Sequence, residues 1–172
     1  MFPSHDPFAY QNLFYKYKVK ITDDEINQIL VILKNNKFKN EEQSSTFFNL
    51  NILNFPLLTN VKKQILNILD DKKLYLGNNW AQLYNKNDAH PIHTHHNSIL
   101  SGILYLSEKG SPTIFYNRDF KSYVNPVEKN VLILFPSWIP HEVRPLTSDE
   151  NRLIISFNTN EKTQNKNNNK QS

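Results

Sequence analysis

Four of the six histidines of this chain fall within seven residues, in the stretch HPIHTHH at positions 90–96. His93 and His95 are two residues apart, and in an extended segment such side chains point to the same side. Two imidazoles side by side suit a first-row transition metal. His90 and His96 fall at other phases, and we expect them either in solvent or beside the ligands. A lone H-x-H pair is equally compatible with a histidine-rich surface.

A further histidine follows a strongly apolar segment. The sequence NVLILFPSWIPHEV, residues 130–143, predicts a buried strand that ends in a Pro-Ser-Trp-Ile-Pro turn, with His141 directly after it. The rigid turn holds His141 in a defined direction, which makes this residue a candidate to complete a metal site. Taken alone, His141 is compatible with an ordinary loop histidine.

An arginine opens the last predicted strand, RLIISFN. Arg152 comes eleven residues after His141, about one hairpin away, and Ser156 shares its strand face. The planar guanidinium fork matches the two oxygens of a carboxylate, and the serine hydroxyl can bind the same anion. A charge at this position also commonly just marks the edge of a strand.

The first part of the chain predicts elements that support a sheet. Residues 13–21 alternate large apolar residues with lysines, as in a half-buried strand. Thr22 and Glu25 form a capping box, and the apolar residues after it recur at helical spacing. A second amphipathic helix is predicted over residues 59–71.

After residue 73 the sequence consists of short β-rich runs with turn residues between them. The predicted strands are LYLGNNWAQLYN (74–85), SILSGILYLS (98–107), PTIFYN (112–117), NVLILFP (130–136) and RLIISFN (152–158). Helices followed by closely spaced strands indicate an antiparallel sandwich or jelly roll with helices packed on one side, a mainly β fold of the α+β class.

The length of 172 residues suits one domain. We expect it over residues 1–158, with a helical support region over 1–73 and core strands over 74–158. Residues 159–172 are polar and repetitive, and we expect a disordered tail. The net charge is +4, of which the tail supplies +2, so the charge does not indicate a nucleic-acid partner.

Composition also excludes several classes of site. The chain has no cysteine, which excludes disulfides, thiolate zinc sites and cysteine nucleophiles. It has no apolar run long enough for a membrane span, and its first residues do not have the pattern of a secretory leader. We therefore expect a soluble, cytoplasmic protein.

Three motifs in order carry a family resemblance. They are H-x-H-x-N-S-x-x-S-G-x-x-Y-L from His93, F-P-S-x-x-x-H-x-V-x-P from Phe135 and N-R-x-x-x-S-F-N from Asn151. Over residues 79–158 the chain resembles the 2-oxoglutarate/Fe(II)-dependent oxygenases. It is closest to a subgroup common in marine bacteria and their phages, and distantly similar to prolyl hydroxylases. The resemblance implies a double-stranded β-helix, that is, a jelly roll with the iron at one open end.

The resemblance also implies roles for individual residues. His93 and His141 lie where the family has its two iron-binding histidines. Arg152 lies where the family binds the distal carboxylate of 2-oxoglutarate. Tyr84 and Tyr105, on flanking strands, are further candidates to contact this cosubstrate.

The chain departs from the family at one ligand position. Most such oxygenases have H-x-D, whereas this chain has His95 in place of the aspartate. Either three neutral imidazoles bind the iron, or a carboxylate such as Asp88 or Asp119 arrives from elsewhere. The residue next to His141, Glu142, should point away from the site if its segment is extended. We predict the set His93, His95 and His141.

The function implied is an Fe(II)- and 2-oxoglutarate-dependent hydroxylase that uses O2 and releases succinate and CO2. Its substrate is left open between peptidyl proline, a free amino acid and a nucleobase. Two other functions stay open. A cupin-type metal enzyme without 2-oxoglutarate would also cluster histidines, but it would leave Arg152 without a task. A non-catalytic jelly-roll protein would have no tight Fe(II) site.

Overall fold

The computed structural model describes residues 13–35, 44–45, 51–119, 121–145 and 149–162. Its α-helices are α1 (Asp23–Asn35) and α2 (Thr59–Asp71), and two 3-10 turns, η2 (Ile52–Asn54) and η3 (Pro56–Leu58), precede α2. The strands are β1 (Tyr15–Lys18), β2 (Ser44–Ser45), β3 (Leu74–Tyr84), β4 (His90–His93), β5 (Leu100–Tyr105), β6 (Thr113–Tyr116), β7 (Ser122–Asn125), β8 (Val131–Pro136), β9 (His141–Val143) and β10 (Arg152–Glu161).

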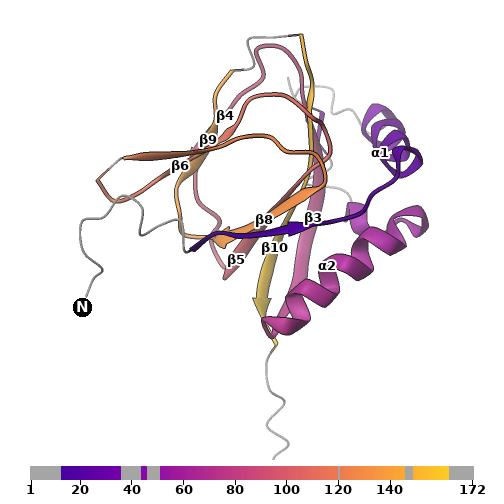
Figure 1. Cartoon of the computed structure of the whole chain (residues 1–172), viewed down its shortest axis with the longest axis horizontal. Coiled ribbons are helices and arrows are strands. Elements are labelled where there is room, and N and C mark those ends of the chain that lie inside the picture. The colour runs from indigo at the N-terminus through magenta and orange to yellow at the C-terminus, as the bar shows by residue number, and fades with distance from the viewer. Residues whose placement is uncertain (1–12, 36–43, 46–50, 120, 146–148, 163–172) are drawn as a thin grey trace, which may run out of the picture.

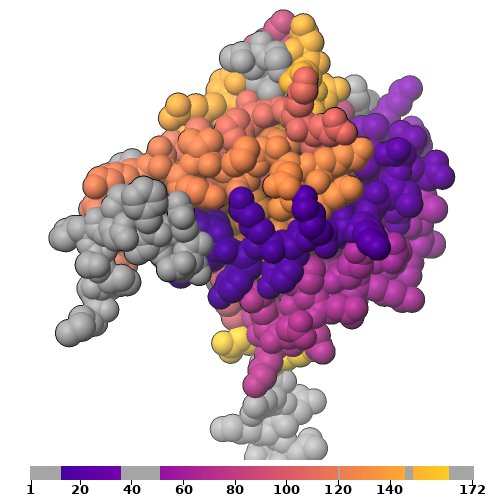
Figure 2. Space-filling view, in the orientation of Figure 1, coloured from indigo at the N-terminus to yellow at the C-terminus, as the bar shows by residue number. Residues whose placement is uncertain are grey.

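The strands form two antiparallel sheets. The larger has the order β1-β8-β5-β10-β3-β2, and the smaller has the order β4-β9-β6-β7. Figure 1 shows the smaller sheet on one side of the larger sheet and both helices on the other side. In Figure 2 the indigo of β1 lies along the orange segment of β8, with which it pairs. The predicted mainly β architecture with helices on one side is confirmed.

Alternation along the central strands separates two apolar cores. On β10, Leu153, Ile155 and Phe157 face the helices, and Ile154 faces the smaller sheet. Arg152 and Ser156 have the phase of Ile154, because side chains two apart on a strand share a face. Polar side chains of β10 therefore enter the space between the sheets, and apolar ones fill the core beneath the helices.

The helices begin and end as their sequences predict. At α1, the backbone N–H of Thr22 donates to Glu25 Oε2 (2.7 Å), and the backbone N–H of Glu25 donates to Thr22 Oγ1 (3.2 Å). This reciprocal pair is the predicted capping box. The second helix has the predicted bounds of 59–71, and its buried residues Val61, Ile65 and Leu69 lie on one face.

The strands differ from the prediction in three ways. The first strand is shorter than the predicted 13–21. Four short strands, β2, β4, β7 and β9, were not predicted as strands. At the other end β10 continues to Glu161, so Thr159–Glu161 belong to the sheet and not to a tail. Lys162 follows β10, and residues 163–172 of the predicted tail lie outside the described residues. No helix in the described part of the chain has the length and apolarity of a membrane span.

Candidate metal centre

Two of the candidate histidines lie opposite each other in the smaller sheet. His93 ends β4 and His141 begins β9, and they are direct partners in the antiparallel ladder. Their ring centroids are 4.2 Å apart. Each ring has its Nδ1 beside the carbonyl oxygen two residues earlier, at 2.8 Å from Pro91 O for His93 and at 3.0 Å from Ile139 O for His141.

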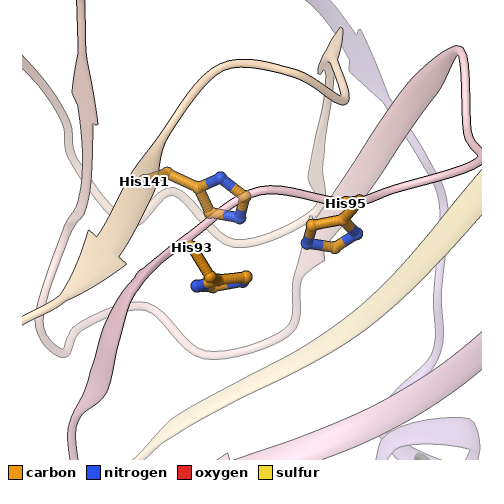
Figure 3. Close-up of side chains that lie close together, drawn as sticks. All are labelled: His93, His95 and His141. Atoms are coloured by element: carbon orange, nitrogen blue, oxygen red, sulfur yellow. The ribbon is translucent and has the colours of Figure 1, made fainter.

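The third histidine comes from the loop after β4. The backbone N–H of His95 donates to Ser137 O (2.9 Å), which ties this loop to the turn after β8. Its ring lies 5.2 Å from that of His93 and 5.1 Å from that of His141, measured between centroids. Figure 3 shows the three rings around a common space, with His93 from β4, His141 from β9 and His95 from the loop.

The three imidazoles have the arrangement of a metal-binding group. One ligand nitrogen from each of His93, His95 and His141 can be chosen so that all lie within 4.8 Å of one another. The Nδ1 of each ring faces an oxygen that can only accept: a backbone carbonyl for two rings and Asn158 Oδ1 for His95 (2.6 Å). Each Nδ1 therefore carries the hydrogen, and each Nε2 has a lone pair for a metal.

Burial keeps these rings neutral. It is the largest cause of the lowered pKa of His93, of His95 and of His141, and the lowering is strongest at His141, the most buried of the three. A neutral imidazole is the form that binds a metal. The charge state and the tautomer of the three side chains thus both fit a first-row metal ion.

The remaining histidines of the cluster lie outside the group of three. His90 stacks on His93 with a centroid distance of 4.1 Å, and its Nδ1 lies 3.3 Å from Tyr84 Oη. Burial, followed by the nearby His93, His95 and Arg152, lowers the pKa of His90 to about 4. His96 is exposed. Of the two histidines that the sequence analysis left open, His90 therefore lies beside the candidate ligands and His96 lies in solvent.

Arg152 is a fully buried cation with unused hydrogen-bond donors. Its Nη2 donates to Thr113 Oγ1 (2.8 Å), whereas its Nε and Nη1 are buried without a partner. The guanidinium carbon lies 4.7 Å from the ring centroid of Tyr84 and 5.4 Å from that of Tyr105. No ion pair of Arg152 with a carboxylate occurs among the described residues. Unpaired buried charge is costly, so such an arginine indicates an anionic ligand.

The arginine and the histidines share one cavity between the two sheets. Its lining includes His93, His95, His141, Arg152, Ser156 and Tyr84. Tyr105 does not line it, but its hydroxyl lies 2.8 Å from Thr113 Oγ1, the acceptor of the Arg152 bond. An anion that reaches from the histidines toward the guanidinium would thus lie within this one cavity.

The carboxylates considered from the sequence lie outside the histidine group. Asp88 accepts from the backbone N–H of Asn85 (2.7 Å) in the turn after β3, and Asp119 lies in the turn after β6. Glu142 accepts from Tyr116 Oη (2.5 Å) and from Arg144 Nε (3.0 Å). Within the described residues, the group of three histidines therefore includes no carboxylate.

Sequence reasoning missed two residues that contact the site. Asn158 accepts from His95, and Thr113 accepts from Arg152. The sequence does point to Asn158 as a site residue, because Asn158 closes the third motif and shares the strand face of Arg152 and Ser156. Nothing in the sequence points to Thr113, because its partner lies 39 residues further along the chain.

A family model described as "Putative 2OG-Fe(II) oxygenase", where 2OG is 2-oxoglutarate, matches residues 108–158. This segment runs from before β6 into β10 and contains His141 and Arg152. No curated protein sequence matches the chain.

Several solved structures have the same fold. The viral collagen prolyl hydroxylase vCPH of Paramecium Bursaria Chlorella virus-1, in a 2-oxoglutarate complex, has 12% identity and a TM-score of 0.63 over 87% of this chain and 96% of its own. HygX of Streptomyces hygroscopicus, with nickel and 2-oxoglutarate bound, has 11% identity and a TM-score of 0.66 over 95% of this chain and 88% of its own. A Pseudomonas putida prolyl-4-hydroxylase has 14% identity and a TM-score of 0.57 over 87% and 93%.

These comparisons agree with the geometry. The chain has the double-stranded β-helix fold of the 2OG-Fe(II) oxygenases, and residues 108–158 have the sequence pattern of that family. The resemblance to the 2-oxoglutarate/Fe(II)-dependent oxygenases is thereby confirmed for residues 108–158 and for the fold, and the marine bacterial and phage subgroup stays a prediction.

Proposed function

We propose that the protein is an Fe(II)- and 2-oxoglutarate-dependent dioxygenase that hydroxylates its substrate. In this proposal His93, His95 and His141 bind the iron, and Arg152 binds the far carboxylate of 2-oxoglutarate. One observation carries the proposal: a buried guanidinium with two unpaired nitrogens lines the same cavity as three imidazoles, each with its Nδ1 beside an acceptor oxygen. HygX, which has this fold, binds iron in one structure, and nickel with 2-oxoglutarate in another.

Three neutral ligands give the iron site a specific electrostatic character. Imidazoles leave the full double positive charge of Fe(II) uncompensated, whereas the usual carboxylate would cancel part of it. An anionic cosubstrate is therefore attracted both by the metal and by Arg152. With both groups bound, the centre would supply the oxidative decarboxylation of 2-oxoglutarate by O2, with one oxygen atom entering succinate as CO2 leaves and the other inserted into a substrate C–H bond.

The protein's own side chains bind the cosubstrate, orient it and exclude water from it. The Arg152 guanidinium can donate to a carboxylate through its unpaired Nε or Nη1, while its Nη2 donates to Thr113 Oγ1. Ser156 lies on the same strand face and can donate its hydroxyl to the same carboxylate. Tyr84 and Tyr105 flank the guanidinium and keep water from it. Such orientation and exclusion of water are the protein's part in a cofactor reaction.

Arg152 also distinguishes this function from the alternatives. A cupin-type enzyme without 2-oxoglutarate would have to bury a guanidinium with no anion to bind, at a cost of several kcal/mol. A non-catalytic jelly roll would have no reason to orient three imidazole tautomers toward one space. Both alternatives therefore leave observed features of the cavity without a role.

The substrate classes are those expected from the sequence: peptidyl proline, a free amino acid or a nucleobase. Two of the similar structures described above are prolyl hydroxylases, so a proline-containing peptide is the first compound to assay. We place the reaction in the cytoplasm, where 2-oxoglutarate and Fe(II) are both available.

The deciding experiment is an anaerobic titration with Fe(II) and then 2-oxoglutarate. We expect a weak visible charge-transfer band on addition of 2-oxoglutarate, and its loss in Arg152→Ala with Fe(II) binding retained. Succinate formation in air, with each substrate class added in turn, then identifies the substrate. Fe(II) binding without the band would instead favour the cupin-type enzyme, and absence of Fe(II) binding would favour the non-catalytic protein.

A further inference from the structure

The three candidate ligands are held by different kinds of partner. His93 and His141 both direct Nδ1 to the backbone carbonyl two residues earlier in their own segments. These two rings are therefore fixed by local backbone. The Nδ1 of His95 instead faces the Oδ1 of Asn158, a side chain of β10 that lies 63 residues further along the chain, at 2.6 Å.

Hydrogen bonds at both the nitrogen and the oxygen of its side-chain amide hold Asn158 in place. Its Nδ2 donates to Asn78 Oδ1 (3.1 Å), which sets the orientation of the amide. Its Oδ1 accepts a second hydrogen bond from Ser101 Oγ (3.0 Å), so that both lone pairs are used. Ser101 in turn lies 2.8 Å from Ser137, Oγ to Oγ, and both serines are fully buried.

The pairing of β3 with β10 is also irregular at Asn158. On β10, Phe157 pairs with Asn79 and Thr159 pairs with Leu76, so that two residues of β3 lie opposite Asn158. Such β-bulges re-aim side chains and are frequent next to active sites. The bulge brings Asn78 to the Asn158 amide.

The identity of the ligand at position 95 explains why an acceptor is needed there. An aspartate, the usual residue at this place, has no hydrogen remote from the metal. An imidazole that binds through Nε2 keeps a hydrogen on Nδ1, and within a partly buried site that hydrogen needs an acceptor. Asn158 provides the acceptor, so His95 and Asn158 form a functional pair.

We propose that Asn158 is a positioning residue that fixes the tautomer and the ring direction of His95, and thereby completes the metal centre. This inference rests on the proposed function. Asn158 does not contact the metal, so it acts only through His95. Its side chain can consequently be changed without removing a ligand.

Co(II) binding by the purified full chain tests this inference without 2-oxoglutarate or turnover. Asn158→Leu keeps the side-chain size and removes the acceptor, and we expect an about 10–100-fold loss of Co(II) affinity. Asn158→Asp keeps the acceptor and makes it more basic, so we expect at least wild-type affinity. Asn160→Leu is the matched control: it removes an amide two residues further along β10 that hydrogen-bonds Thr159 O, Asn97 O and Tyr75 Oη. Among the described residues this amide hydrogen-bonds no histidine, and we expect wild-type affinity.

Two further measurements separate positioning from general destabilisation. The melting temperature of metal-free Asn158→Leu should fall no more than that of Asn160→Leu, and the Co(II) visible spectrum should change in Asn158→Leu alone. In a His95→Ala background, Asn158→Leu should cause no further loss of Co(II) affinity, because its only route to the metal is gone.

The outcomes are distinguishable. Wild-type affinity in Asn158→Leu, or an equal loss in Asn158→Asp, overturns the positioning role and leaves the metal centre intact. A full additional loss in the His95→Ala background does the same. Absence of Co(II) binding by the wild-type chain overturns the metal centre itself, and the role of Asn158 with it.

Discussion

His93 and His141 are paired residues of one antiparallel ladder, at the end of β4 and the start of β9. Facing residues of such a pair have their side chains on the same side of the sheet. The two strands thus present two imidazoles as a unit, each ring hydrogen-bonded to its own backbone. His95 comes from the loop that follows β4. The whole candidate ligand set therefore lies on β4, on this loop and on β9.

The first prediction concerns this ligand set. Replacement of either His93 or His141 by alanine should lower Co(II) or Fe(II) affinity by more than the about 10–100-fold typical of changes beyond the ligands. At a metal concentration 100 times the wild-type Kd, binding should stabilise the wild-type fold by about 2.7 kcal/mol and leave either variant nearly unchanged. Thermal unfolding with and without metal measures this difference.

His96→Ala is the matched control for that prediction. His96 is exposed and lies next to His95, yet it is not part of the group of three. We expect its metal-dependent stabilisation to equal that of the wild type. A comparable loss in His96→Ala would mean that a different set of imidazoles binds the metal.

The second prediction concerns the cost of Arg152 to stability. Replacement of buried charged groups by apolar residues of similar size often stabilises a fold. Arg152→Met should therefore raise the free energy of unfolding of the ligand-free protein by about 1 kcal/mol or more. The same variant should lose 2-oxoglutarate binding while it keeps metal binding. Urea unfolding and calorimetric titration measure the two effects.

A destabilised Arg152→Met variant would contradict this account. It would mean that the bond to Thr113 and the two tyrosine rings compensate the buried guanidinium, and that Arg152 serves the fold. Arg152→Lys provides the control for charge: it keeps the cation without the planar fork, so we expect weaker 2-oxoglutarate binding and no gain in stability.

Features that depend on neighbours in the sequence could be predicted. The capping box of Thr22 and Glu25 spans four residues, and the apolar period of the second helix gives its buried residues Val61, Ile65 and Leu69. Likewise, alternation on β10 predicted that Arg152 and Ser156 share a face. Local hydrogen bonds and side-chain periods are properties of the sequence itself.

Features that depend on pairing across the fold could not be predicted. β4, β7 and β9 have only three or four residues each, too few for an alternation pattern, and they are strands because of the partners they pair with. The contact of His95 with Asn158 joins a loop residue to a residue of β10 that lies 63 positions further along the chain. Spacing showed that His93 and His95 can act together, but not which acceptor holds either ring.

The third prediction tests the capping box as the start of α1. Thr22→Ala removes the side-chain oxygen that accepts from the Glu25 N–H, and it should lower the free energy of unfolding by about 1 kcal/mol. Thr22→Ser keeps that oxygen and should lose much less. Urea unfolding of the two variants gives the comparison, and equal losses would assign the effect to the methyl group of Thr22 and not to the cap.

The fourth prediction concerns Gly102 on β5, which faces Phe157 on β10. A Cβ at this position would lie 2.2 Å from Phe157 Cζ, and the Phe157 ring is fully buried beneath the helices. Because the ring cannot move into solvent, Gly102→Ala should cost about 1–3 kcal/mol of stability through overpacking. Phe157→Leu should reduce that cost, since the smaller side chain leaves room for the methyl group. Urea unfolding of the two single variants and the double variant measures this coupling. Additive losses would show that strain in the β5 backbone, and not the contact with Phe157, requires glycine at position 102.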